Sequence, residues 1–154
     1  MDTPRTPEKF YKMFGRFSYI ETQPPTGAII NVDRKWQRNI VPIDFAGKKI
    51  WGHRAVKDSL ESIWTQWTAL RHPYKVIFSG CYNPRHQMNN PKKPLSIHSW
   101  GAAIDLNAQT NLPGKPGDLP DELVSLFENE GWNWGGRWTA KDAMHFQMYN
   151  GKSF

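Results

Sequence analysis

The stretch SIHSWGAAIDLN, residues 96–107, places a histidine just before a tight turn and an aspartate inside the strand that is expected to follow. Fully extended, the chain between His98 and Asp105 would span about 23 Å, so no single cation would touch both side chains. The chain must therefore double back between them. Gly101 permits this reversal because glycine tolerates backbone angles that are forbidden to other residues. We expect Trp100 to brace the turn from outside.

The stretch DAMH, residues 142–145, carries a second aspartate and a second histidine. Side chains three apart in a regular strand face opposite ways, so Asp142 and His145 share one site only if the chain bends between them. With that bend, two imidazoles and one carboxylate form a ligand set that suits one catalytic zinc ion with an open fourth position: His98, Asp105 and His145. Asp142 then fits as the general base, and Arg85 is the candidate to stabilise an oxyanion.

Around these motifs the apolar pattern predicts an α+β protein with a small, mostly antiparallel sheet and flanking helices. Apolar residues spaced by four and three positions predict an amphipathic helix over 54–71, with Leu70 on its buried stripe, and Pro120 opens a second helix over 120–129. We expect strands at 75–79, which reads as buried, and at 102–107 and 145–148. Residues 1–50 are rich in Pro and Gly and predict a wrapping arm with brief strands at 17–21, 28–32 and 39–45.

Length and charge limit the classes of function. With 154 residues the chain is expected to form one domain, and we expect a monomer. Twenty Lys and Arg against 14 Asp and Glu give a net charge of +6, which favours an anionic partner, and nucleic acid, phospholipid and bacterial wall polymer all qualify. Basic residues are not interleaved with aromatics, so we expect no nucleic-acid partner. Cys81 is the only cysteine, which excludes an intrachain disulfide and a thiolate metal cluster.

The N-terminal residues contain no apolar run of signal-peptide length, and no stretch of about 18 apolar residues occurs. We therefore expect no integral membrane segment and synthesis in the cytoplasm without a signal peptide. A substrate outside the membrane would then require another route of delivery.

The combined motifs resemble a known family of peptidases. The pattern Ser96-x-His98-x-x-Gly101-x-Ala103-x-Asp105-x-Asn107 is followed by GWNWGGRW at 131–138 and by Asp142-x-x-His145. This order resembles the zinc-dependent, VanY-like D-alanyl-D-alanine carboxypeptidases, a family that includes L-alanyl-D-glutamate endopeptidases, many of them phage endolysins, and the vancomycin-resistance dipeptidases. The strong resemblance covers about residues 76–149.

The resemblance implies that His98, Asp105 and His145 bind zinc, that Asp142 is the base and that Arg85 stabilises the tetrahedral intermediate. It also implies a substrate in the peptide stem of peptidoglycan and a fold shared with the Hedgehog signalling domain. Arg137 stands where many relatives carry an acidic residue, which leaves the charge of the substrate groove open.

Four further residues are candidates for contact with substrate. Eight tryptophans are many for this length, and we expect Trp100 and Trp138 to line a groove where an aromatic face packs on a peptide stem or sugar. Ser96 and Gln87 are the polar candidates. Gln87 opens the loop 87–95, which either gates substrate entry or is an ordinary connection.

Two other functions fit parts of this pattern. Two histidines and a carboxylate also form the facial triad of non-haem iron oxygenases, although there the first histidine and the acid usually lie closer than the seven positions that separate His98 and Asp105 here. A non-catalytic, zinc-containing module that binds the cell wall would need neither Asp142 nor Arg85. The peptidase is therefore the leading hypothesis. A phage endolysin released through a holin is the expected setting, and trimming of recycled or resistance-related peptides in the cytoplasm is the alternative.

Overall fold

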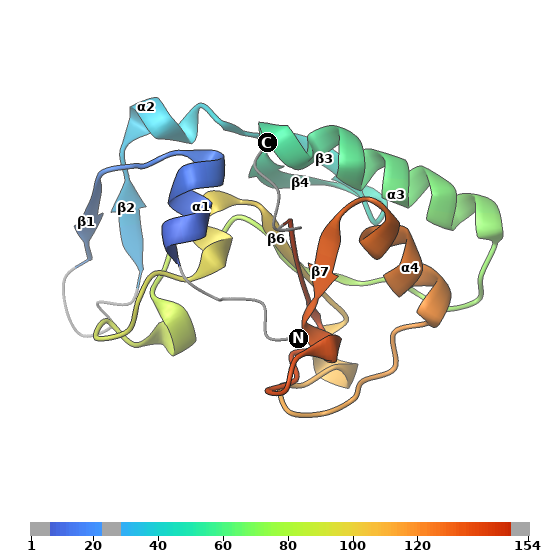
Figure 1. Ribbon diagram of the computed structural model, residues 1–154. Helices are drawn as coiled ribbons and strands as arrows, with labels where there is room; N and C mark the ends of the chain where they lie inside the picture. The colour runs from blue at the N-terminus through green and yellow to red at the C-terminus, as the bar shows by residue number, and fades with distance from the viewer. Residues whose placement is uncertain (1–6, 23–28, 149–154) are drawn as a thin grey trace.

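The computed structural model describes residues 7–22 and 29–148, which form helices and small antiparallel sheets, so the expected α+β class is confirmed (Figure 1). The helices of the described residues are α1 (Pro7–Phe14), α2 (Arg34–Gln37), α3 (Lys57–Leu70) and α4 (Asp121–Asn129). The strands are β1 (Tyr19–Glu21), β2 (Ile30–Val32), β3 (Ile40–Phe45), β4 (Lys48–His53), β5 (Phe78–Gly80), β6 (Ala103–Leu106), β7 (Trp132–Trp134) and β8 (His145–Met148).

The sheet that positions the candidate site has the strand order β5-β6-β8-β7, and all its neighbours are antiparallel. The strands predicted at 102–107 and 145–148 are confirmed as β6 and β8. Two-residue alternation explains their placement, because Ile104, Leu106 and Phe146 are fully buried on the face opposite to Asp105 and His145. The sequence reasoning missed β7 and β4.

The two predicted long helices cover the core (Figure 1). The helix predicted at 54–71 is a 3₁₀ turn at Arg54–Val56 followed by α3, and the helix predicted at 120–129 is α4. Leu60 and Ile63 of α3 are fully buried, but Leu70 is 52% exposed, so its assignment to the buried stripe was wrong. In Figure 1 the C-terminal end of α3 projects past the strands, where the last turn has no sheet to cover.

Among the first fifty residues, the described part contributes helices as well as brief strands to the core. The strands predicted at 17–21 and 39–45 are shortened to β1 and β3, and the strand predicted at 28–32 is described only from residue 29 on, as β2. The helices α1 and α2 were not expected in this segment. Phe10 and Phe14 of α1 are buried and pack against each other and against Trp100 and His53.

The strand predicted at 75–79 was placed too early and was wrongly expected to be buried. The strand β5 begins only at Phe78, and Ile77 is 52% exposed. Ile77 instead exchanges hydrogen bonds with Asn107, whose side-chain oxygen accepts from the Ile77 N–H at 2.9 Å.

None of the helices in the described part of the chain is long and apolar enough to cross a membrane.

Candidate metal centre

A short turn brings His98 back over the strand that follows it. Residues Ile97–Trp100 form a 3₁₀ helix, which Ser96 caps by accepting a hydrogen bond from the His98 N–H. Gly101 ends this helix at φ +67°, and a Cβ atom there would lie 2.8 Å from the backbone nitrogen of His53. Only glycine satisfies both the left-handed backbone and this close approach. The expected chain reversal is therefore present.

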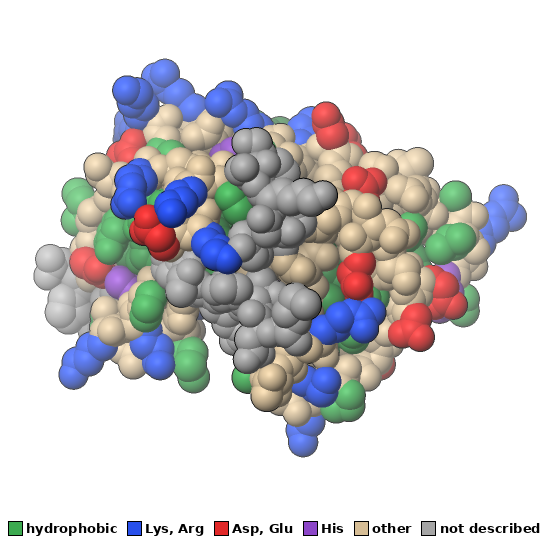
Figure 2. Space-filling view, viewed as in Figure 1, with side chains coloured by type: hydrophobic (Ala, Val, Ile, Leu, Met, Phe, Trp, Pro, Cys, Tyr) green, Lys and Arg blue, Asp and Glu red, His purple; other side chains and the backbone are tan. Residues whose placement is uncertain are grey.

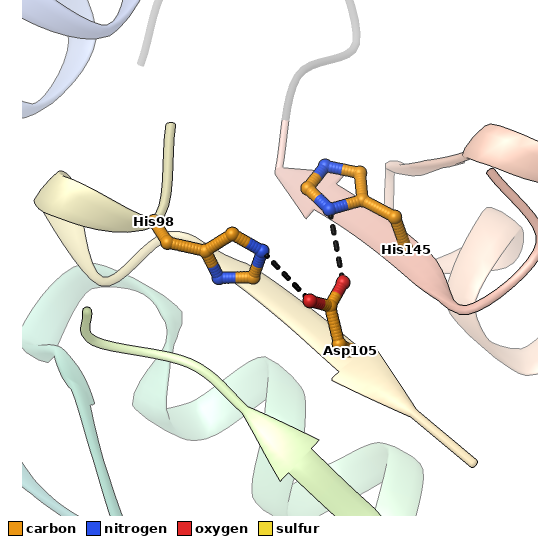
Figure 3. A group of neighbouring side chains, drawn as sticks. All are labelled: His98, Asp105 and His145. Atoms are coloured by element: carbon orange, nitrogen blue, oxygen red, sulfur yellow. Dashed lines mark hydrogen bonds and ion pairs between the residues drawn. The ribbon is translucent and has the colours of Figure 1, made fainter. Parts of the chain in front are cut away.

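The sheet register then places Asp105 between the two histidines. Asp105 on β6 pairs directly with His145 on β8, so both side chains lie on the same face. The Asp105 carboxylate lies 3.2 Å from His98 Nε2 through Oδ2 and 3.1 Å from His145 Nδ1 through Oδ1 (Figure 3). One donor atom from each of the three residues lies within 4.8 Å of the others. These residues could hold one metal ion.

Hydrogen bonds on the far side of each imidazole decide which nitrogen faces the centre. His98 Nδ1 donates to the carbonyl oxygen of Cys81 at 2.8 Å, which leaves Nε2 free to present its lone pair to an ion. His145 Nε2 lies 3.0 Å from the side-chain oxygen of Gln147, so Nδ1 is the nitrogen that faces Asp105. Such outer partners are typical of histidines that ligate metals.

The electrostatics of the centre favour a charged carboxylate. Burial raises the pKa of Asp105, but the charge of His98 and hydrogen bonds from both histidines outweigh burial and hold this pKa well below its ordinary value. Burial lowers the pKa of His145, and its hydrogen bond to Asp105 outweighs that effect and raises it. A carboxylate and two imidazoles in one compact group are the nitrogen and oxygen ligands that zinc accepts.

A tight turn brings Asp142 to the same side of the sheet as His145. Residues 143 and 144 form a turn in which the His145 N–H donates to the Asp142 carbonyl oxygen at 3.0 Å, so the expected bend is confirmed. Gly135 packs directly against the backbone of Asp142, and a Cβ atom at Gly135 would collide with the Asp142 carbonyl oxygen. The glycine therefore allows the segment after β7 to fix the position of Asp142.

A cleft of about 540 Å³ opens over the three candidate ligands, a volume within the usual range for small-ligand pockets. The residues predicted to act on or contact substrate that line it are Arg85, Gln87, Ser96, Trp138 and Asp142. Two hydrogen bonds fix the position of Arg85. Its backbone N–H donates to Ser99 Oγ at 3.1 Å, and its guanidinium donates to the His86 carbonyl oxygen at 3.2 Å.

Trp100 was wrongly expected to line the substrate groove. Its side chain is fully buried, and its Nε1–H donates to the Gly15 carbonyl oxygen at 3.1 Å. The rings of Phe10, Tyr11 and Phe17 lie against it. Trp100 braces the turn as expected, but from inside the core, because the missed helix α1 packs over it.

Arg137 lies outside the residues that line the cleft. Its guanidinium pairs with Glu128 of α4 at 2.8 Å and lies over the ring of Trp134. Arg137 therefore forms its ion pair at the surface of α4, and other side chains set the charge of the cleft.

His53 and His72 accept hydrogen bonds from nearby backbone N–H groups, in agreement with the expected capping roles.

The polar residues of the cleft wall that the sequence reasoning did not name as site residues include Asn83 and Gln147. Gln147 carried a usable signal, because residues two apart on a strand share a face and His145 was already a candidate. Asn83 carried no comparable signal, since it lies in an irregular segment between β5 and the 3₁₀ turn.

Comparison with known proteins agrees with this geometry. Residues 89–148 match the family model of D-alanyl-D-alanine carboxypeptidases, and this match confirms the resemblance seen in the motifs. The matched region contains all three candidate ligands and Asp142. No curated protein and no solved structure matched the chain. The site and the match together support a peptidase with a His/Asp/His group that could bind a metal ion.

Proposed function

We propose that the protein is a zinc-dependent peptidase that hydrolyses an amide bond in the peptide stem of bacterial peptidoglycan. One observation carries this proposal: His98, Asp105 and His145 converge beneath a cleft whose wall also includes Asp142 and Arg85. A purely structural metal site would need neither an additional carboxylate nor a guanidinium beside it. The family match over residues 89–148 makes D-alanyl-D-alanine peptide stems the first substrate class to test.

Each residue of the centre has a defined part in this reaction. His98, Asp105 and His145 would hold the ion, and a bound zinc ion would supply Lewis acidity at the scissile carbonyl. Asp142 takes a proton from the attacking water and returns it to the leaving amine. Arg85 places its positive charge where the carbonyl oxygen becomes negative in the transition state.

The cleft offers contacts suited to a peptide. Asn83, Gln87 and Ser96 provide hydrogen-bonding side chains, while Trp138 provides an apolar wall and lies 5.5 Å from the ring of His145. An open cleft with both kinds of lining fits a short peptide that keeps part of its length in solvent.

The central experiment compares the zinc-loaded protein with Asp142→Ala on purified cell walls. The parent should release new amino groups, and the variant should lose about 10²–10⁴-fold in rate while it retains zinc, because only the proton transfer is removed. Equal rates would show that Asp142 is not the base. Walls that are bound but never cut would favour the non-catalytic binding module, and iron with oxygen-dependent turnover would favour the oxygenase.

The proposal also covers which peptide bond is cleaved and how the protein reaches the cell wall. We infer an endolysin-type or carboxypeptidase-type cleavage, and mass spectrometry of digested muropeptides distinguishes the terminal D-Ala-D-Ala bond from the L-Ala-D-Glu bond or a crossbridge. We also propose that the protein reaches the wall after release through a phage holin. The net charge of +6 supports retention at an anionic wall.

A further inference from the structure

Gln147 occupies an unusual place for a polar side chain. It lies in β8, an inner strand of the sheet, opposite Ala103 of β6 and Asn133 of β7. Its side chain shares a face with His145, two residues earlier, and the residue is fully buried. A methionine would fill similar space without an amide that requires partners, so burial alone does not account for glutamine here.

The two ends of the Gln147 amide have different surroundings. Its oxygen lies 3.0 Å from His145 Nε2. Its nitrogen Nε2 is buried and has no hydrogen-bond partner among the described residues. A buried donor without a partner costs about 1–3 kcal/mol, and such exceptions in folded proteins call for an explanation. Gln147 also belongs to the wall of the cleft.

The orientation of the amide determines the state of the imidazole. With the oxygen toward His145, Nε2 keeps a proton, and Nδ1 is the nitrogen that would present a lone pair to an ion bound beside Asp105. With the amide reversed, the Gln147 N–H would donate to Nε2 and the proton would sit on Nδ1, where it would face the ion. A ligand set built on Nδ1 therefore depends on the acceptor that Gln147 supplies.

We propose that Gln147 is a positioning residue of the metal centre, whose amide oxygen fixes His145 as an Nδ1 ligand, an orientation that leaves the buried amide N–H without a partner. This inference rests on the proposed function, since it assumes the metal centre. The sequence motifs did not single out Gln147.

The test measures zinc dissociation constants by competition with a chelator. Gln147→Met removes the acceptor at similar volume and should weaken zinc binding about 10–100-fold, whereas Gln147→Glu retains an acceptor and should bind zinc at least as tightly as the parent. Asn133→Leu is the matched control, because it removes the neighbouring amide on the same face, outside the cleft wall, and should leave zinc binding unchanged. Unaltered zinc affinity in Gln147→Met would overturn the positioning role.

A second measurement needs no variant. The ¹⁵N spectrum of the zinc-loaded parent should show His145 protonated on Nε2 and metal-bound through Nδ1, and the reverse pattern would overturn the inference. A parent that binds no zinc would overturn the proposed function as well, whereas failure of the Gln147 variants alone leaves the peptidase intact.

Discussion

His53 is a buried histidine whose role is structural. It is 6% exposed and packs against the rings of Phe14 and Trp36, while its Nδ1 accepts a hydrogen bond from the Ala55 N–H at 3.0 Å. Burial, assisted by the charge of Arg54, lowers the pKa of His53 to about 4. The ring is therefore neutral in the folded protein and becomes protonated near pH 6.5 once the chain unfolds.

This difference predicts that acid destabilises the protein through His53. Between the unfolded pKa and the folded pKa the unfolded chain binds the extra proton, so the free energy of unfolding falls as the pH falls. The contribution of His53 between pH 7.5 and pH 5 is roughly 2 kcal/mol. His53→Asn retains a capping acceptor but does not titrate, and urea denaturation should show a correspondingly smaller loss of stability. The same pH dependence in both proteins would refute the assignment.

At the scale of elements, the strand β1 is tied to the loop that borders the cleft. His86 lies 2.8 Å from the Glu21 carboxylate through Nε2 and 2.6 Å from the Lys93 carbonyl oxygen through Nδ1. The loop closes on itself as well, because the Gln87 N–H donates to the Pro94 carbonyl oxygen at 2.9 Å. Its first residues line the cleft, so the β1 contact supports one wall of the site.

Loss of this tie should loosen the loop without unfolding the sheet. Glu21→Gln weakens the contact with His86, and the half-exposed position of Glu21 limits the effect to about 1 kcal/mol. Amide exchange at Gln87 and at Ser96 should become roughly fivefold faster, which hydrogen exchange followed by NMR measures. Glu8→Gln removes another surface ion pair, with Arg16, and should leave these amides unchanged. Equal protection in Glu21→Gln would show that β1 does not restrain the loop.

At the scale of the whole molecule, the face drawn in Figure 2 carries an uneven distribution of charge. Figure 2 shows Lys and Arg side chains gathered over α1 and α2, and acidic side chains over α3 and α4. Arg34 and Lys35 of α2 are exposed, whereas α4 begins with Asp121 and Glu122. An anionic wall polymer would therefore meet the α1 and α2 side first.

Reversal of the charge on α2 should weaken retention on purified cell walls. The double variant Arg34→Glu, Lys35→Glu should be released from the walls at lower salt than the parent in a pelleting assay. Fewer attractive charges hold the variant on the wall, so less salt is needed to screen them. Arg71→Glu with Lys75→Glu makes the same change in net charge at exposed positions near the C-terminal end of α3 and should have the smaller effect. Equal losses in both variants would mean that net charge alone governs retention.

The sequence by itself determined the features that depend on local spacing. Two-residue alternation located β6, the 3.6-residue pattern located α3, Pro120 marked the first turn of the helix that contains α4, and Gly101 marked the chain reversal beside His98. Residue chemistry then selected His98, Asp105 and His145 as one ligand group, which the sheet register brings together. The helices, the strands and the chain reversal are predictable because each is set by neighbours in the chain.

Only the tertiary structure decided which side chains are buried by contacts between segments that are distant in the sequence. Trp100 became a core residue because α1 packs over the turn, and Gly15, the residue after α1 and eighty-five positions before Trp100, accepts a hydrogen bond from its indole N–H. Gln147 became a partner of His145 because β8 lies between β6 and β7. Local periodicity does not predict contacts between distant segments, because the free energy of burial depends on the whole packed core rather than on adjacent residues.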